Sequence, residues 1–162
     1  MVTVTASADA QHTPFRALSV RYERETPRIK HLATYGLLRH VRMARMAGYD
    51  DAAFVDRGGM LSEGSTWNLC LYDGERWLWP QAEVLTGVTM ELLRAAMVEE
   101  GIPTGQLAIR ANDLTGFKAA FATNSVSPAR PLAAIGVNTF PPLATSQALL
   151  KDLYDSIAWQ SI

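Results

Sequence analysis

The sequence predicts a single domain of mixed structure, in the α+β class. Segments with the two-residue alternation of strands lie between segments of helical period, without the regular strand–helix order of a doubly wound sheet. The chain has 162 residues, of which 48% are hydrophobic and 19% are charged, as is usual for one globular core. An Asp73-Gly74 pair between two strand-like segments also predicts a hairpin turn.

Strands are predicted along the whole chain, and residues 8–14 are predicted to form a linker after the first strand. The predicted strands are 2–6, 17–22, 51–56, 68–72, 76–79, 107–110, 119–123 and 131–136. Helices are expected at 32–47, from 86 to about 100, and from Thr145 or Ser146 onward, where a hydroxyl can cap the first turn. Gly48 and Gly101 are the expected helix stops.

Each predicted helix has an apolar face that we expect to meet the core. The core faces carry Leu37, Val41 and Ala44 in the first helix, Leu92, Leu93, Ala96 and Met97 in the second, and Leu150, Leu153 and Ile157 in the third. Three arginines, at positions 39, 42 and 45, lie off the first of these faces. We interpret them as a solvated surface and not as an anion site.

Composition argues against several classes of protein. The net charge is −1 and no dense basic stripe is present, so no nucleic-acid partner is expected. No apolar run is long enough for a membrane span, and residues 1–10 lack the pattern of a secretory signal. The single cysteine, Cys70, rules out an internal disulfide and fits a reducing cytoplasm, with core packing its expected role. The histidines show no zinc-like grouping, so no metal site is expected.

Four groups of residues could carry chemistry. They are Lys30 with Tyr35, the carboxylate of Glu63 in a turn of small residues at 62–68, the hydroxyls and glycine of 85–89 at a helix start, and the polar run 122–127 after a strand. Each has an ordinary alternative: a solvated lysine or glutamate, a threonine cap, or a turn. A lysine amine can also hold a carbonyl covalently, and a helix N-terminus can hold a phosphate.

Together these groups match what pyridoxal phosphate (PLP) requires: an amine for its aldehyde, a carboxylate for its ring nitrogen and a cradle for its phosphate. From about residue 15 onward the sequence resembles the large, C-terminal domain of the fold-type IV (class IV) PLP-dependent enzymes. This family includes branched-chain and D-amino-acid aminotransferases and aminodeoxychorismate lyase. The resemblance implies a pseudo-β-barrel with flanking helices.

The resemblance also implies a role for individual residues, in the family's order. Lys30 falls on the Schiff-base lysine and Tyr35 on the tyrosine that binds the phenolic oxygen of the cofactor. Glu63 falls on the glutamate that pairs with the protonated ring nitrogen, and Asn68 on the asparagine that follows it. The remaining matches are Leu85 against the ring, Val88 and Thr89 at the phosphate-binding helix start, and Ser125 as a later phosphate hydroxyl.

Family members carry a smaller N-terminal domain before this region, and we expect this chain to lack it. We expect residues 1–14 to be the last strand and linker of that domain, and residues 15–162 to be the class IV C-terminal domain. The missing part normally supplies a phosphate-binding arginine, and no arginine here takes that place by motif. Arg130 is close to the cradle in sequence only.

Three interpretations of the short chain remain open: a fragment, one half of a split enzyme, or a domain repurposed for other work. The expected function is PLP-dependent chemistry on a small amino substrate, with transamination first and an aminodeoxychorismate-lyase-like reaction second. The alternative is a cofactor-independent small-molecule binding or cyclase domain. Apolar surface left exposed by the missing domain predicts a homodimer or a partner that supplies that domain.

Overall fold

The computed structural model describes residues 13–158, and the predicted strand at 2–6 lies outside this range. The strands are β1 (Phe15–Arg21), β2 (Asp51–Val55), β3 (Leu61–Gly64), β4 (Asn68–Tyr72), β5 (Trp77–Pro80), β6 (Thr104–Leu107), β7 (Ala119–Thr123), β8 (Arg130–Ile135) and β9 (Asn138–Thr139). The helices are α1 (Tyr35–Met46), α2 (Val88–Glu99) and α3 (Ala144–Asp155).

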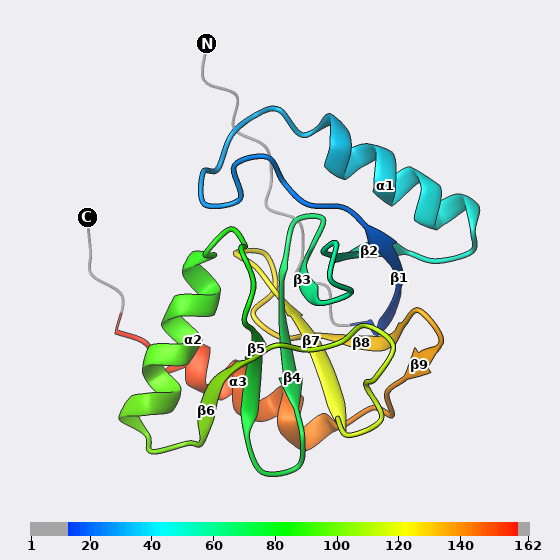
Figure 1. The fold of residues 1–162 in the computed structure, drawn as a ribbon. Coiled ribbons are helices and arrows are strands. Elements are labelled where there is room, and N and C mark those ends of the chain that lie inside the picture. Colours follow the sequence, from blue (N-terminus) through cyan, green and yellow to red (C-terminus); the bar gives the residue numbers. More distant parts are fainter. Residues whose placement is uncertain (1–12, 159–162) are drawn as a thin grey trace.

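The strands form a barrel-like sheet, as expected for the α+β class (Figure 1). The pairing order β3-β2-β1-β8-β7-β4 closes on itself because β3 also pairs with β4. Strand β1 is parallel to both β2 and β8, whereas β3, β4 and β7 pair antiparallel with their neighbours. Strands β5 and β6 extend the sheet beyond β4, and β9 pairs with β8. The predicted pseudo-barrel is confirmed.

Two-residue alternation explains how the barrel strands are buried on both faces. On β4, Leu69 and Leu71 pack in the cluster inside the barrel, while Cys70 between them packs on the outer side with residues of α2 and α3. On β2, Ala53 faces the inner cluster and Phe54 packs toward α1. Burial raises the pKa of the Cys70 thiol well above its usual range, which fits the predicted packing role.

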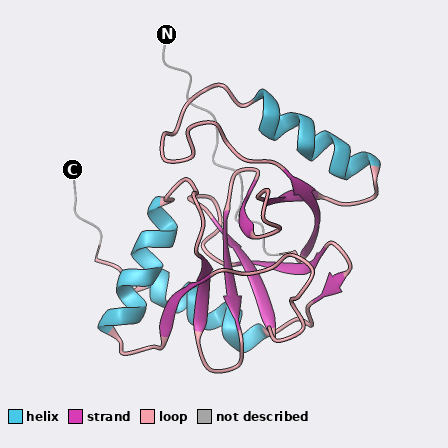
Figure 2. Ribbon diagram, in the orientation of Figure 1, coloured by secondary structure: helices cyan, strands magenta, loops and turns pink. Residues whose placement is uncertain are grey.

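The helices cover the outside of the barrel in two places (Figure 2). Helix α1 packs on β1 and β2 through the buried Leu37 and Ala44, as predicted. Helices α2 and α3 pack on each other and join one cluster with the tryptophans of β5. The arginines at 39, 42 and 45 are exposed, which agrees with a solvated face.

Two of the predicted turns have the expected geometry. Gly48 follows α1 with φ +82°, a left-handed conformation that glycine adopts without strain. In the β4–β5 hairpin, Gly74 has φ +111° and Asp73 Oδ1 accepts hydrogen bonds from the backbone N–H groups of Glu75 and Arg76, at 2.8 and 2.7 Å. The carboxylate therefore fixes the turn in the way that Asp-Gly sequences favour.

Several predicted boundaries are wrong. Helix α1 begins at Tyr35 and not at Leu32, because a local turn precedes it, in which the backbone N–H of Ala33 donates to His31 Nδ1 at 3.1 Å. The strand predicted at 107–110 is β6 at Thr104–Leu107 instead. Its start is fixed by its parallel pairing with β5, where Trp77 lies opposite Thr104.

The start of α3 also differs from the prediction. No side chain caps this helix, whose N-cap is Leu143, and Ser146 is buried within its first turn. Leu150 and Leu153 are buried as expected, but Ile157 lies beyond the end of the helix. Strands β3 and β9 were not predicted. Residues 61–64 contain two polar side chains and a glycine, so they lack the apolar alternation of a strand.

Large apolar side chains are exposed on α1 and on the segment before it. Leu32 is 98% exposed, and the others are Ile29, Tyr35, Leu38, Met43 and Met46. Patches of this kind commonly mark interfaces. None of the helices within residues 13–158 has the length and apolar character needed to cross a membrane.

The last residue of β3 gives a test of packing inside the barrel. A Cβ added to Gly64 would lie 1.9 Å from Cε2 of Trp67, whose ring is held by a 3.1 Å hydrogen bond from Nε1 to Asp51 Oδ2. We therefore expect Gly64→Ala to lower the free energy of unfolding by about 2 kcal/mol or more, measured by urea denaturation.

Gly105→Ala is the matched control for this prediction. Gly105 lies on strand β6, and its added Cβ would be 3.9 Å from Cδ2 of Leu78, an ordinary contact distance. Gly105→Ala should change the free energy of unfolding by no more than about 0.5 kcal/mol. Equal effects of the two substitutions would contradict the assigned role of Gly64.

Candidate functional site

Three polar side chains lie at the same level on three neighbouring strands. Glu63 of β3 is opposite Asn68 of β4, which is opposite Thr123 of β7. All three residues are buried, and the Glu63 residue is only 6% exposed. The sequence analysis placed Glu63 in a turn, whereas the structure places it inside a strand. Strand pairing on both sides therefore fixes its backbone.

Two of these side chains hold the same residue of the β5–α2 loop. Glu63 Oε2 accepts a hydrogen bond from the backbone N–H of Leu85 at 3.1 Å. Asn68 Nδ2 donates to the carbonyl oxygen of Leu85 at 2.8 Å. The barrel thus positions the segment that leads into α2. Glu63, Asn68 and Leu85, which the sequence pattern assigned to one site, lie together.

Gly87 allows this contact between the barrel and the loop. A Cβ at position 87 would lie 2.3 Å from Asn68 Oδ1, which is much closer than real atoms approach. Gly87 is also the N-cap of α2, and no side chain caps this helix. The backbone N–H groups of its first turn lack intrahelical partners, which makes the helix start a possible anion site. Thr89 there is buried and Val88 is 73% exposed.

A cavity of about 340 Å³ lies against Glu63. This volume is within the range typical of sites for small molecules, roughly 300–1,000 Å³. Its wall is formed by Tyr22, Glu23, Arg24, Pro27, Phe54, Asp56, Ser62, Glu63, Ala82 and Glu83. A second cavity of about 370 Å³ shares Ala82 and Glu83 with the first and extends to Thr86 and Arg94.

The ionisation of Glu63 is strongly affected by its surroundings. Burial raises the pKa of this carboxyl group from 4.5 to about 7, although the Leu85 N–H and the Arg24 guanidinium both act to lower it. Glu63 Oε1 is 3.9 Å from Arg24 Nε, which is beyond hydrogen-bond distance. A buried carboxylate of this kind is suited to a cationic or N–H-bearing ligand group.

Arg24 and Tyr22 are residues of this cavity that the sequence analysis did not identify. Both follow the core residues of β1 and come from the segment between β1 and α1. The Arg24 side chain is only 7% exposed. No local motif marks either residue, and the available signal was the strand-like alternation that includes Tyr22.

Lys30 and Tyr35 have a different environment from Glu63. Both are exposed, Tyr35 by 79%, and neither is among the described residues that form the cavity wall. The segment that carries them does reach the cavity, because Pro27 is part of the wall. An ion pair also holds this segment to the β5–α2 loop, with Arg28 Nη2 at 2.9 Å from Glu83 Oε1.

The polar run after β7 forms a turn. Asn124 Oδ1 accepts hydrogen bonds from the backbone N–H groups of Val126 and Ser127, at 3.0 and 2.9 Å. Ser125 is exposed at the tip of this turn. Thr123 Oγ1 is buried and has no hydrogen-bond partner among the described residues. Within residues 13–158 no group of His, Cys, Asp or Glu side chains could hold a metal ion.

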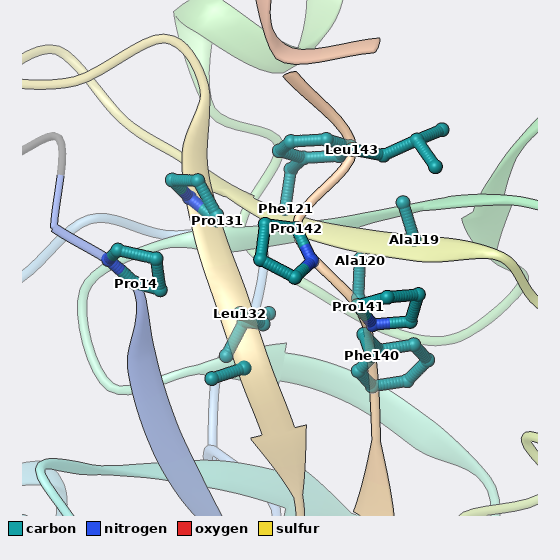
Figure 3. Close-up of a pocket in the computed structure, with 11 residues that line it drawn as sticks. Pro14, Ala119, Ala120, Phe121, Pro131, Leu132, Phe140, Pro141, Pro142 and Leu143 are labelled. Carbon is teal, nitrogen blue, oxygen red and sulfur yellow. The ribbon is translucent and has the colours of Figure 1, made fainter. Parts of the chain in front are cut away.

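A separate apolar pocket lies between β7, β8 and the segment before α3 (Figure 3). Its volume is about 70 Å³, and Pro14, Phe121, Pro131, Phe140 and Pro142 are among its lining residues. None of the residues that line it is ionisable. This pocket is too small for a typical ligand and has no group that could take part in acid–base chemistry.

The fold is that of class IV aminotransferases. The family model described as amino-transferase class IV matches residues 2–135, and the chain belongs to this family. A comparison with curated protein sequences finds no match.

Solved structures with the same fold include aminotransferases, one of them in a PLP-bound form. A protein provisionally named 4-amino-4-deoxychorismate lyase, from Legionella pneumophila, has a TM-score of 0.84 and 20% identity, over 91% of this chain and 57% of its own. A fold IV transaminase from Curtobacterium pusillum has a TM-score of 0.79 and 25% identity, over 91% and 55%. A hypothetical aminotransferase from Mycobacterium tuberculosis, in a PLP-bound form, has a TM-score of 0.78 and 18% identity, over 88% and 55%. The chain spans little more than half the length of these proteins.

Replacement of Glu63 tests its ionisation in the protein without ligand. Because the pKa of Glu63 in the folded chain lies above 4.5, the folded state binds the proton more tightly, and Glu63 makes the chain less stable as pH rises from about 4.5 to 7. Glu63→Gln removes this loss. At pH 8 we expect Glu63→Gln to be more stable than the wild type by up to about 3 kcal/mol, with little difference at pH 4.5, by urea denaturation.

Glu83→Gln serves as the control, because this carboxylate borders the same cavity but its side chain is 67% exposed. Because an exposed ion pair contributes little, the stability of Glu83→Gln should stay within about 1 kcal/mol of the wild type at both pH values. A Glu63→Gln difference that does not change with pH would show that Glu63 is ionised as readily in the folded chain as in the unfolded one.

Proposed function

We propose that this chain binds PLP in the cavity beside Glu63 and uses it for amino-group chemistry on a small amino substrate. Transamination is the first candidate reaction, and cleavage of an amino-chorismate-like substrate is the second. The observation that supports the proposal most directly is the buried Glu63 carboxylate at the wall of a cavity of about 340 Å³. Family membership supports the same chemistry.

The residues present fit the cofactor in three respects. Glu63 Oε1 faces Arg24 at 3.9 Å without a hydrogen bond, so it can accept one from a ring N–H. Arg24 Nε and Thr123 Oγ1 are both buried and have no hydrogen-bond partner within residues 13–158. Buried polar atoms are normally satisfied, so unpaired ones indicate a place for a ligand or water.

Each residue then has a defined part in the reaction. PLP, when bound, draws electrons from the substrate Cα. Glu63 would hold the ring nitrogen, and the uncapped start of α2 at Val88 and Thr89, with Ser125, would bind the phosphate. Asn68 holds the Leu85 carbonyl through the 2.8 Å hydrogen bond, and Leu85 would contact the cofactor ring. The Lys30 amine would carry the proton to and from the substrate Cα, and Tyr35 would bind the phenolic oxygen.

A second candidate function is cofactor-independent binding of a small molecule, or a cyclase reaction. The exposure of Lys30 and Tyr35 favours it, because the cavity is formed without either side chain. In this case Glu63 and Arg24 would bind a polar ligand directly, and the lysine would have no role.

The proposal extends to assembly and location. The exposed apolar side chains of α1 and the segment before it would be covered in a homodimer or by a partner that supplies the remaining part of the family's architecture. We propose that the protein acts in the cytoplasm, where its single buried cysteine remains reduced.

Cofactor attachment is the direct test of this function. The chain has three lysines, Lys30, Lys118 and Lys151, all of them exposed. After titration with PLP and borohydride reduction, we expect a visible absorbance band before reduction and, by peptide mass mapping, a cofactor adduct on Lys30. Lys30→Ala should lose the band, because the covalent partner is gone.

Lys118→Ala and Lys151→Ala are matched controls and should keep the band. Both lysines are exposed, Lys118 lies next to Tyr72 at the end of β4 opposite Asn68, and Lys151 lies on α3. Adduct spread evenly over the three lysines, or undiminished in Lys30→Ala, would exclude the cofactor function. If the band forms, a keto acid made from an added amino acid would support transamination, whereas a substrate split into two fragments would support the lyase reaction.

A further inference from the structure

Arg24 is the buried cation of the Glu63 cavity. Its side chain is 7% exposed, and burying a guanidinium is costly unless negative or polar groups compensate it. Two groups partly compensate the charge of Arg24. Glu63 Oε1 lies 3.9 Å from Nε, and the carbonyl oxygen of Ile29 accepts a hydrogen bond from Nη2 at 3.4 Å. Arg24 therefore contacts both the carboxylate and the segment that carries Lys30.

The other charged groups of the cavity wall are acidic and have partners of their own. Glu23 Oε1 accepts a hydrogen bond from the backbone N–H of Arg57 at 3.0 Å. Asp56 Oδ1 accepts one from the backbone N–H of Met60 at 2.8 Å. Glu83 is paired with Arg28.

Arg24 is the only cation among the described residues that line this cavity. Burial opposes the ionisation of a carboxylate. Without a nearby cation, Glu63 would be the group least able to keep its charge, because it is the most deeply buried of the four acids.

We propose that Arg24 is a positioning residue of the cofactor site, which favours the charged form of Glu63 against the effect of burial and ties the Lys30 segment to the cavity through the Ile29 carbonyl. The proposal rests on the proposed PLP function. A charged Glu63 is what a protonated ring nitrogen requires as a partner, and one guanidinium can serve both contacts because its donors form a rigid fork. A lysine has a single donor group and cannot span the two in the same way.

The first test measures Glu63 in the chain without cofactor. In protein labelled with ¹³C at glutamate carboxyl carbons, the Glu63 resonance is assigned by its absence in Glu63→Gln and is followed from pH 4.5 to 9. In Arg24→Gln the carboxyl should bind its proton more tightly than in the wild type, by roughly two- to threefold, because an opposite charge within about 4 Å is lost.

Arg28→Gln is the matched control. Arg28 also belongs to the β1–α1 segment and pairs with a glutamate, Glu83, but its side chain is 77% exposed. This variant should leave the titration of Glu63 unchanged. An unchanged Glu63 titration in Arg24→Gln, or an equal change in Arg28→Gln, would overturn the proposal.

Arg24→Lys separates charge from position and replaces the test if Arg24→Gln does not fold. The lysine keeps the positive charge, so the Glu63 titration should stay close to that of the wild type. Amide hydrogen exchange at residues 26–31 should become about threefold faster, because the bond to the Ile29 carbonyl is lost. If Glu63 in Arg24→Lys titrated at a different pH from the wild type while amide exchange at residues 26–31 stayed the same, Arg24 would not have both roles.

The same variants distinguish this proposal from the cofactor function on which it rests. If the wild type forms no Lys30 adduct but Arg24→Gln displaces the Glu63 titration, the cofactor function fails and the effect of Arg24 on Glu63 stands. If the adduct forms equally in the wild type and Arg24→Gln, and the Glu63 titration is the same in both, the role of Arg24 fails alone.

Discussion

The site depends on the pair of hydrogen bonds by which the barrel holds the backbone of Leu85. Glu63 accepts from its N–H group and Asn68 donates to its carbonyl, so two strands fix one loop residue at both of its polar groups. The start of α2, one wall of the cavity and the orientation of Glu63 all follow from this arrangement. A buried polar network of this kind is favourable only when its members are satisfied, and here both polar groups of the Leu85 backbone have partners.

The cost of this arrangement falls on Glu63. Its surroundings oppose ionisation through burial and permit it through one N–H group and one guanidinium at 3.9 Å. A stability-optimised core would not contain such a group, since an apolar residue would avoid the desolvation cost. The location of a destabilising side chain at the wall of the cavity is the usual mark of a residue kept for binding or chemistry.

Much of the fold could be predicted from sequence, because local rules and packing agree there. Strand β4 at Asn68–Tyr72 and strand β7 at Ala119–Thr123 match their predictions, and the Asp73 turn follows from its chemistry. Strand β3 could not be predicted, because its polar residues become buried only through pairing with β2 and β4.

In the site, sequence order indicated Glu63, Asn68 and Leu85. Arg24 was missed since no local pattern distinguishes a buried arginine from a solvated one, and the exposure of Lys30 and Tyr35 depends on the path of the segment before α1.

Gly87 has a consequence for how this sequence can change. Any side chain at position 87 would collide with Asn68 Oδ1, which would be 2.3 Å away. A substitution at 87 is therefore tolerable only after residue 68 has become smaller, and that change gives up the bond to the Leu85 carbonyl. The two positions, distant in sequence, form a linked pair in which neither can vary first without loss. In homologous chains that have a side chain at position 87, we accordingly expect a different contact to hold residue 85.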